Sequence, residues 1–221
     1  MNGYLQPLMD LYEAHADGTI AAGSRKYMRD QFDFLGIRSA ERQALTKGFW
    51  KEQGLPGRDL QAVVEDLWSR PERDYQYAAL EFLGKMKKTL GPGDMPWLTE
   101  LIVTKSWWDT VDFLSPHIMG YLFRTYPELI PLHADRWIED ENFWLQRAAI
   151  LYQLKYKETT DEERLYRYVI RRSDSREFFV QKAIGWVLRE YAKVRPDSVQ
   201  AFVAGNELKP LSRREALKHF K

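Results

Sequence analysis

Residues 105–112 read Lys-Ser-Trp-Trp-Asp-Thr-Val-Asp, and two related stretches follow further along the chain. These are Trp-Leu-Gln-Arg-Ala-Ala at 144–149 and Phe-Val-Gln-Lys-Ala-Ile at 179–184. A period of 35 residues aligns all three. Self-similarity near this period is typical of solenoids that are built from helical hairpins.

One repeat position in this alignment carries mostly charged residues. It holds Arg42, Tyr77, Asp112, Arg147 and Lys182 in chain order. A position inside a hydrophobic core would not read this way, because charged side chains are almost never buried without a partner. Helical solenoids present one residue per repeat along an inner surface. We therefore predict that this position forms the functional face.

Other repeat positions behave differently. Positions 78, 113, 148 and 183 read Ala, Phe, Ala and Ala, and positions 79, 114, 149 and 184 read Ala, Leu, Ala and Ile. These two positions predict the packed side of the helices. A further position, four residues before the charged one, holds Arg73, Trp108, Phe143 and Phe178. Since residues four apart share a helix face, Trp108 should lie one helical turn from Asp112.

Nearly every segment reads as an amphipathic helix, with turn residues at short intervals and no sustained alternation of period two. The predicted fold is all-α, an α-α superhelix (solenoid) of about six helical repeats. No linker composition divides the chain, so we predict a single domain over residues 1–221.

The composition excludes several classes of site. Apolar residues make up 44% of the 221 residues, which predicts a folded protein. With no cysteine, disulfides and thiolate metal sites are excluded. The four histidines are never four residues apart, which argues against a helical zinc site. We expect no metal and no cofactor.

The chain begins without a basic region followed by an apolar run, so no secretory signal is expected. No apolar stretch approaches the roughly 20 residues that a membrane helix needs. We expect a soluble, monomeric, cytoplasmic protein with no membrane partner.

Positive charge gathers in the second part of the chain. From residue 145 to the end there are 17 Lys and Arg against 10 Asp and Glu, whereas the preceding part holds 16 against 22. Such asymmetry is one indication of a half that binds a polyanion, although helical proteins often carry locally basic faces.

Asp112 and Trp108 are the strongest candidates for chemistry. They lie one helical turn apart, and a carboxylate beside an indole could stabilise a cation. The alternative is a salt-bridged aspartate beside a core tryptophan. Trp107 points elsewhere, because adjacent helical residues diverge by roughly 100°, and the repeat register assigns it to the core.

Three further positions form a similar group near the end of the chain. Lys182, Trp186 and Arg189 share one helix face by their spacing. Arg147 stands in an otherwise apolar helix, where a cation needs either a carboxylate or a phosphate as its partner.

The stretch at 105–112 resembles the bacterial AlkD-type DNA alkylation repair enzymes, which are DNA glycosylases built of HEAT-like repeats. The resemblance extends over essentially the whole chain, through residues 34–37, 144–150, 181–193 and 211–216. It implies a right-handed α-α superhelix of about six HEAT-like helical repeats, and association with the nucleoid when the protein binds DNA. The segment 38–42 is similar to a family segment that contacts DNA.

The resemblance implies hydrolysis of the N-glycosidic bond of cationic alkylated purines, N3-methyladenine and N7-methylguanine, in double-stranded DNA. In this family the residues that match Trp108, Asp112 and Trp186 line the lesion site, and the one that matches Arg147 supports DNA binding there. The predicted catalytic residues are Asp112, Trp108 and Trp186, and the predicted DNA-binding residues are Arg147, Lys182, Arg189, Arg42, Tyr27 and Lys155.

Two other functions remain open at this point. One is a non-catalytic HEAT-repeat protein that binds bent or branched DNA, and the other is a scaffold that grips a helix of a partner protein. A scaffold should have a more apolar inner face than this chain offers. Release of methylated purine would separate a glycosylase from both.

Overall fold

The computed structural model describes residues 3–220, and the regular structure in this range is helical. Within it, the one strand-like pairing is an isolated bridge between Asp33 and Glu72. The all-helical prediction is therefore confirmed for the described residues.

Packing contacts divide the chain into two compact units, of which the first ends at Thr89 and the second begins at Leu90. The prediction of a single domain over residues 1–221 stays a prediction.

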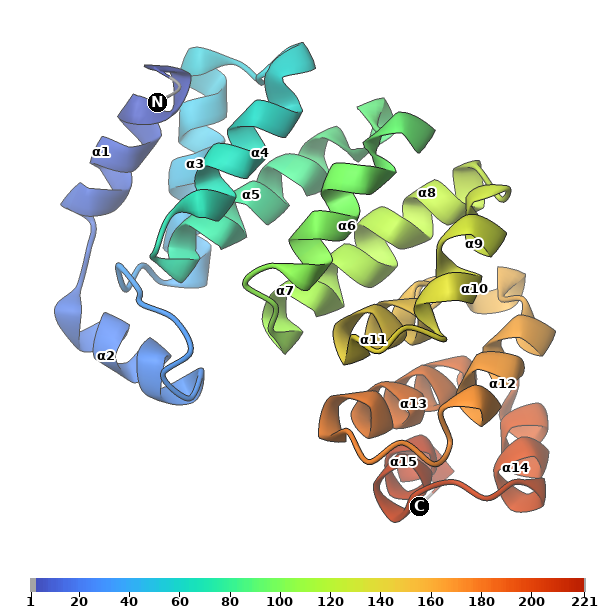
Figure 1. The fold of residues 1–221 in the computed structure, drawn as a ribbon. Helices are drawn as coiled ribbons and strands as arrows, with labels where there is room; N and C mark the ends of the chain where they lie inside the picture. Colours follow the sequence, from blue (N-terminus) through green and yellow to red (C-terminus); the bar gives the residue numbers. More distant parts are fainter. Residues whose placement is uncertain (1–2, 221) are drawn as a thin grey trace. The chain divides into compact units, whose positions relative to one another are not determined.

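The first unit is a set of five α-helices with short 3₁₀ turns between them (Figure 1). These helices are α1 (Gln6–Ala14), α2 (Gly18–Tyr27), α3 (Ser39–Gln53), α4 (Leu60–Ser69) and α5 (Arg73–Met86). The 3₁₀ turns are η1 (Gly3–Leu5), η2 (Gly57–Asp59) and η3 (Lys87–Thr89).

The α-helices of the second unit differ in length, from 4 to 14 residues. Its α-helices are α6 (Met95–Val103), α7 (Trp108–Phe113), α8 (Gly120–Thr125), α9 (Leu129–Leu132), α10 (Ala134–Trp137), α11 (Phe143–Leu151), α12 (Glu162–Arg171), α13 (Phe178–Tyr191), α14 (Pro196–Gly205) and α15 (Pro210–Ala216). Between them lie the 3₁₀ turns η4 (Pro92–Asp94), η6 (Lys157–Thr159) and η7 (Lys218–Phe220), and a π-helical segment, η5 (Leu114–Met119).

Hydrogen bonds join residues that lie about one repeat apart in the sequence. In the first unit the Tyr12 hydroxyl and Thr46 Oγ1 are 2.7 Å apart, 34 residues along the chain. In the second unit the Tyr156 hydroxyl donates to the Gly120 carbonyl at 2.7 Å, 36 residues away. Residues separated by close to the predicted period of 35 are thus neighbours in each unit.

The two repeat positions that were predicted to pack are buried. At most 1% of the surface is exposed at Ala78, Ala148, Ala183, Ala79, Leu114, Ala149 and Ile184. Phe113 departs from the prediction because it is half-buried and contacts His117, with ring centroids 4.8 Å apart, where α7 passes into the π-helix. Small residues at the other positions let helix backbones approach closely.

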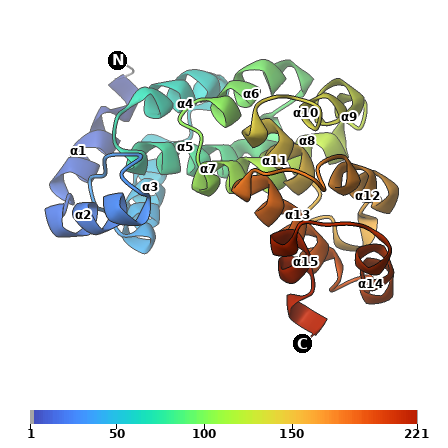
Figure 2. The ribbon, with the colours of Figure 1, turned by 60° about the horizontal axis from the view of Figure 1, so that its bottom comes forward.

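One close approach of this kind joins α13 to α15, which lie side by side in both views (Figures 1 and 2). A Cβ atom added at Gly185 would overlap Cβ of Glu215 and would lie 2.9 Å from the Ser212 carbonyl oxygen. The Ser212 hydroxyl also donates to the Gln181 carbonyl at 3.0 Å. Gly185 therefore allows α15 to sit directly on α13.

Candidate active site

Asp112 and Arg147 are brought together as an ion pair between α7 and α11. Arg147 Nε donates to Oδ1 of Asp112 at 2.7 Å, and Nη2 donates to Oδ2 at 2.8 Å. The side chain of Arg147 is 4% exposed and that of Asp112 is 17% exposed. Such a two-point contact fixes the plane of the carboxylate as well as its position. Of the two partners that the sequence left open for Arg147, the carboxylate is present.

Arg147 makes a third contact, which sequence reasoning missed. Its Nη1 donates to the backbone carbonyl of Phe179 at the start of α13. One guanidinium therefore links α7, α11 and α13. A backbone carbonyl acceptor has no sequence signature, so no pattern could have revealed this contact.

The cap of α11 helps to place Arg147. Asn142 Oδ1 accepts from the Trp144 backbone N–H at 2.9 Å and so fixes the first turn of the helix. Arg147 follows one turn later among buried apolar residues. The apolar surroundings leave the guanidinium no water to bind, which strengthens its preference for Asp112.

Burial raises the pKa of Asp112 above its ordinary value of 3.8, although the hydrogen bonds and charge of Arg147 act in the opposite direction. The negative charge of Asp109 raises it further. The ionised carboxylate is therefore poorly hydrated. In such surroundings it interacts more strongly with a nearby positive charge than it would in water.

The helix type changes two residues after Asp112, at Leu114. Pro116 has no N–H to donate to the carbonyl of Asp112, as an α-helix would require, and residues 114–119 form a π-helix. Ser115 contributes by donating its hydroxyl to the Val111 carbonyl at 2.6 Å. π-Helical turns inside α-helices are frequent at functional sites.

Aromatic side chains surround the Arg147–Phe179 contact. The Trp107 ring lies 5.9 Å from that of Trp144 and 5.1 Å from that of Phe179, measured between centroids. Phe143 stacks on Phe179 at 6.3 Å with an interplanar angle of 6°. Trp107 thus packs within this aromatic cluster, in an extended conformation just before α7, yet it is only partly buried.

The two tryptophans of the predicted site are both partly exposed. Trp108 is the first residue of α7, one turn before Asp112. Trp186 lies on α13 between Lys182 and Arg189 and shares their face by its spacing. These positions fit the predicted roles, which stay predictions.

Lys182 and Arg189 meet at Glu215 of α15. Lys182 Nζ lies 3.2 Å from Oε1 of Glu215, and Arg189 Nη1 lies 2.7 Å from Oε2. Lys218 Nζ is 2.7 Å from the same Oε1. Burial alone would raise the pKa of Glu215, but hydrogen bonds from the three cations outweigh it and lower the pKa to about 2. Sequence reasoning missed both Glu215 and Lys218.

In the first unit, Arg42 is 8% exposed and pairs with Glu81, Nε to Oε1, at 3.2 Å. Its guanidinium also lies 4.6 Å from the ring centroid of Tyr77. Tyr27 ends α2 and is 71% exposed. Lys155 of the second unit is exposed in the segment after α11 and is not part of the clusters around Arg147 or Glu215.

Arg73 precedes Tyr77 by one helical turn, at the repeat position that Trp108 occupies in the second unit. Unlike Trp108 it is fully buried, and its guanidinium lies 3.8 Å from the centroid of the Phe32 ring. Its backbone N–H donates to the Asp33 carbonyl at 2.8 Å. The loop between α2 and α3 therefore covers Arg73, and a repeat alignment carries no information about that loop.

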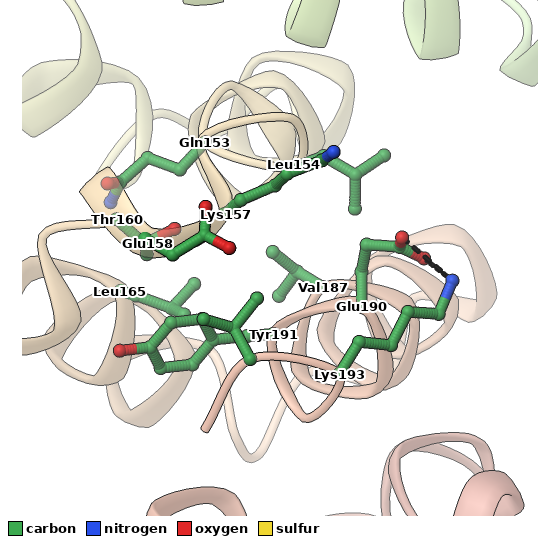
Figure 3. A pocket seen from close by; sticks show the side chains of 11 residues that line it. Gln153, Leu154, Lys157, Glu158, Thr160, Leu165, Val187, Glu190, Tyr191 and Lys193 are labelled. Atoms are coloured by element: carbon green, nitrogen blue, oxygen red, sulfur yellow. Dashed lines mark hydrogen bonds and ion pairs between the residues drawn. The ribbon is translucent and has the colours of Figure 1, made fainter. Parts of the chain in front are cut away.

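A pocket of about 370 Å³ lies between the segment after α11, α12 and the end of α13 (Figure 3). Val187 and Tyr191 line it, and the Glu190–Lys193 ion pair stands at one side. None of the predicted site residues is among the side chains that line it.

Within residues 3–220, no group of three His, Cys, Asp or Glu could hold a metal ion, and no helix is long and apolar enough to cross a membrane.

Comparison with known proteins shows the family of the chain. The model of the DNA alkylation repair enzyme family matches residues 8–220. The chain belongs to this family. A solved structure described as a predicted DNA alkylation repair enzyme from Enterococcus faecalis is 33% identical, with a TM-score of 0.86. The match covers 93% of this chain and 96% of that one. Among curated proteins, a search found no match.

The family match confirms the resemblance that was drawn from residues 105–112, and the similarity to the solved structure confirms the helical-repeat fold class. Membership of this family supports a role in the repair of alkylated DNA and DNA as a partner. Substrate and reaction type are finer questions, and they depend on the site.

Proposed function

We propose that the protein is a DNA glycosylase that hydrolyses the N-glycosidic bond of N3-methyladenine and N7-methylguanine in duplex DNA, the first step of base excision repair. The observation that carries this proposal is the partly buried Asp112 carboxylate, held at both oxygens by Arg147. Membership of a DNA alkylation repair family supports the substrate class.

The charge of the lesion removes the need for a general acid. Alkylation at N3 or N7 makes the purine cationic, so the bond between C1′ and nitrogen breaks with both electrons leaving on the base. The base departs as a neutral molecule, and positive charge develops on the deoxyribose. The remaining task is to stabilise that charge and to deliver water to C1′.

Asp112 suits this task. A fixed anion in poorly hydrated surroundings stabilises a developing positive charge without reorganising at the moment of reaction. Water then forms the new bond to C1′, and its proton can pass to the carboxylate, whose pKa is raised by burial. Because Arg147 fixes both oxygens, the carboxylate keeps one orientation throughout.

The two tryptophans and the cations of α13 complete the proposal. Trp108 and Trp186 would contact the sugar, whose cationic character attracts the faces of indole rings. Lys182 and Arg189 would contact phosphates near the lesion. Any phosphate at Arg147 would compete with Asp112 for the same donors, so we assign Arg147 chiefly to positioning Asp112.

The test is to incubate the protein with methylated duplex DNA and to identify the bases that are released. We expect N3-methyladenine or N7-methylguanine in solution, with an abasic strand left behind. Duplexes that contain uracil or hypoxanthine serve as controls, because their neutral bases should be released far more slowly. Efficient release of these neutral bases would contradict the mechanism. Salt-sensitive DNA binding without any release would favour the non-catalytic alternative.

A further inference from the structure

Glu215 organises three cations at the junction of α13 and α15. Its side chain is 6% exposed, whereas those of Lys182, Arg189 and Lys218 are 36%, 21% and 50% exposed. The anion is therefore inside and the cations outside. A simple ion pair at the surface would need only one of these three cations.

The charge in this cluster is not balanced. Three cations share one carboxylate, which leaves two positive charges in excess. Two other ion pairs of the second unit balance one to one, Arg147 with Asp112 and Lys193 with Glu190. Glu139 is shared by two arginines, which leaves a smaller excess of one. Two excess positive charges around one buried carboxylate attract an anion.

The position of the cluster follows from the packing of the two helices. Gly185 lets α15 approach closely enough for Glu215 to reach both Lys182 and Arg189. These two residues precede and follow Trp186 on one face of α13, four and three residues away. The cations therefore lie on the same helix face as a predicted lesion-site tryptophan.

The hydrogen bonds of Arg189 leave room for a further acceptor. Its Nη1 donates to Oε2 of Glu215 at 2.7 Å and to the Glu215 carbonyl at 3.3 Å. Both contacts use one nitrogen of a guanidinium that carries five N–H donors. An arginine held in this way can offer its other edge to a phosphate.

We propose that Lys182, Arg189 and Lys218 form one seat for backbone phosphates of duplex DNA, and that Glu215 is the positioning residue that holds them in place. The inference rests on the proposed function for the lesion beside Trp186, but its first test does not depend on catalysis. Lys218 becomes a DNA contact that the repeat pattern did not predict.

The first test measures how salt weakens binding to an undamaged duplex. Each phosphate contact contributes about 0.9 to the slope of log affinity against log salt concentration. Lys218→Gln should lower this slope by about one contact, that is, by about 0.9. The matched control is Lys193→Gln, because Lys193 is 51% exposed and pairs with Glu190 three residues earlier, much as Lys218 pairs with Glu215. Equal salt slopes for wild type and both variants would contradict the proposed phosphate seat.

The second test separates positioning from simple support of the fold. Glu215→Gln raises the net charge of the seat by one, so undamaged DNA should bind with a steeper salt slope. Excision in a single turnover should nevertheless fall roughly ten-fold, because the cations lose their common anchor and hold the DNA less uniformly. Tighter binding with slower chemistry is not what a destabilised fold produces.

The control for Glu215→Gln is Glu162→Gln. Glu162 also joins helices, through hydrogen bonds from Tyr191 at 2.9 Å and Ser198 at 2.8 Å, but these partners are uncharged hydroxyls. We expect Glu162→Gln to lower the melting temperature while it leaves the salt slope unchanged. If the folded Glu215→Gln variant has the same salt slope and the same excision rate as wild type, the proposed role of Glu215 is wrong. If neither the wild type nor any variant releases a base, the proposed function fails. The salt slopes still show whether the three cations bind backbone phosphates.

Discussion

Arg42 and Arg147 occupy the same repeat position in the two units, and each contacts a carboxylate in a different way. Arg42 reaches Glu81 through Nε alone, at 3.2 Å, and lies over the ring of Tyr77. Arg147 holds both oxygens of Asp112 and also donates to a backbone carbonyl.

The difference lies in which residue of the repeat supplies the acid. Arg42 meets Tyr77 at the next copy of its own position, and the carboxylate of Glu81 comes from one turn further along α5. Arg147 meets Asp112 at the preceding copy, so there the carboxylate itself occupies the repeat position. In both units, residues at this repeat position thus form a contact between neighbouring repeats. Only the second contact places an acid one turn from a partly exposed tryptophan, Trp108.

Asp112→Asn should have the largest effect on catalysis. The amide keeps the size of the carboxylate and can still accept from Arg147, but it no longer opposes a positive charge on the sugar. We expect excision in a single turnover to fall by about 100-fold or more. DNA affinity, measured by fluorescence anisotropy, should change little.

Glu81→Gln is the matching change in the first unit. Burial raises the pKa of Glu81, as it does for Asp112, while Arg42 acts in the opposite direction. A lost charge-assisted hydrogen bond here should lower the free energy of unfolding by about 1.5–3 kcal/mol. Excision by the folded protein should stay near the wild-type rate. Parallel losses of stability and activity in both variants would mean that Asp112 is structural too.

Replacing each arginine by lysine sharpens the comparison. Arg147→Lys keeps the charge but cannot grip both oxygens of Asp112 and the Phe179 carbonyl together. Losing a charged hydrogen bond worth about 1.5–3 kcal/mol corresponds to a roughly 10- to 100-fold slower reaction. Arg42 contacts Glu81 through one nitrogen only, so Arg42→Lys loses less and should slow excision far less. Single-turnover rates on one methylated duplex decide between them, and similar losses for both would contradict the distinction.

Much of this arrangement could be predicted because repeats leave a pattern in the sequence. The alignment at 35 residues identified the buried positions, including Ala148 and Ala183, and it placed Asp112 and Arg147 at neighbouring copies of one position. Residues at neighbouring copies of a repeat position are brought together by stacking, so their contact follows from the period alone.

What the sequence did not predict lies outside that period. The Phe179 carbonyl is a backbone group, and Arg73 is covered by Phe32 from the loop between α2 and α3. Glu215 belongs to the last helix, where the charged position of α13 finds its partner without a further copy of the repeat. Contacts of these kinds depend on local packing, which periodicity does not encode.

A pH titration of stability should distinguish the two acids of the second unit. Three cations outweigh burial and lower the pKa of Glu215 from its ordinary value of 4.5 to about 2. Its charge therefore stabilises the fold above pH 4.5, and this contribution is lost as the pH falls towards 2. Urea unfolding should show that wild type exceeds Glu215→Gln in stability at neutral pH, and that the gap closes on acidification through this range.

Asp112 should show the opposite sign. Because burial raises its pKa above 3.8, the folded state favours its protonated form, and that advantage is present at low pH and lost as the pH rises through the raised pKa. The stability of wild type relative to Asp112→Asn should therefore increase on acidification. A gap that narrows in the same way for both acids would mean that Arg147 outweighs burial at Asp112.

The smallest expected effects concern two helical glycines, one in each unit. Gly185→Ala places a Cβ atom against Cβ of Glu215, so α15 must shift away from α13. Overpacking of this kind lowers the free energy of unfolding by about 1–3 kcal/mol. Gly48 in α3 has nothing within 4 Å of an added Cβ, so Gly48→Ala should instead stabilise the first unit by about 0.5–1 kcal/mol, through the helix propensity of alanine. Urea unfolding measures both changes in stability.

Gly185→Ala should in addition weaken DNA binding, because the contacts of Glu215 with Lys182 and Arg189 depend on the close approach of α15. A Gly185→Ala variant as stable as wild type, with unchanged DNA affinity, would mean that the cation cluster does not depend on that approach.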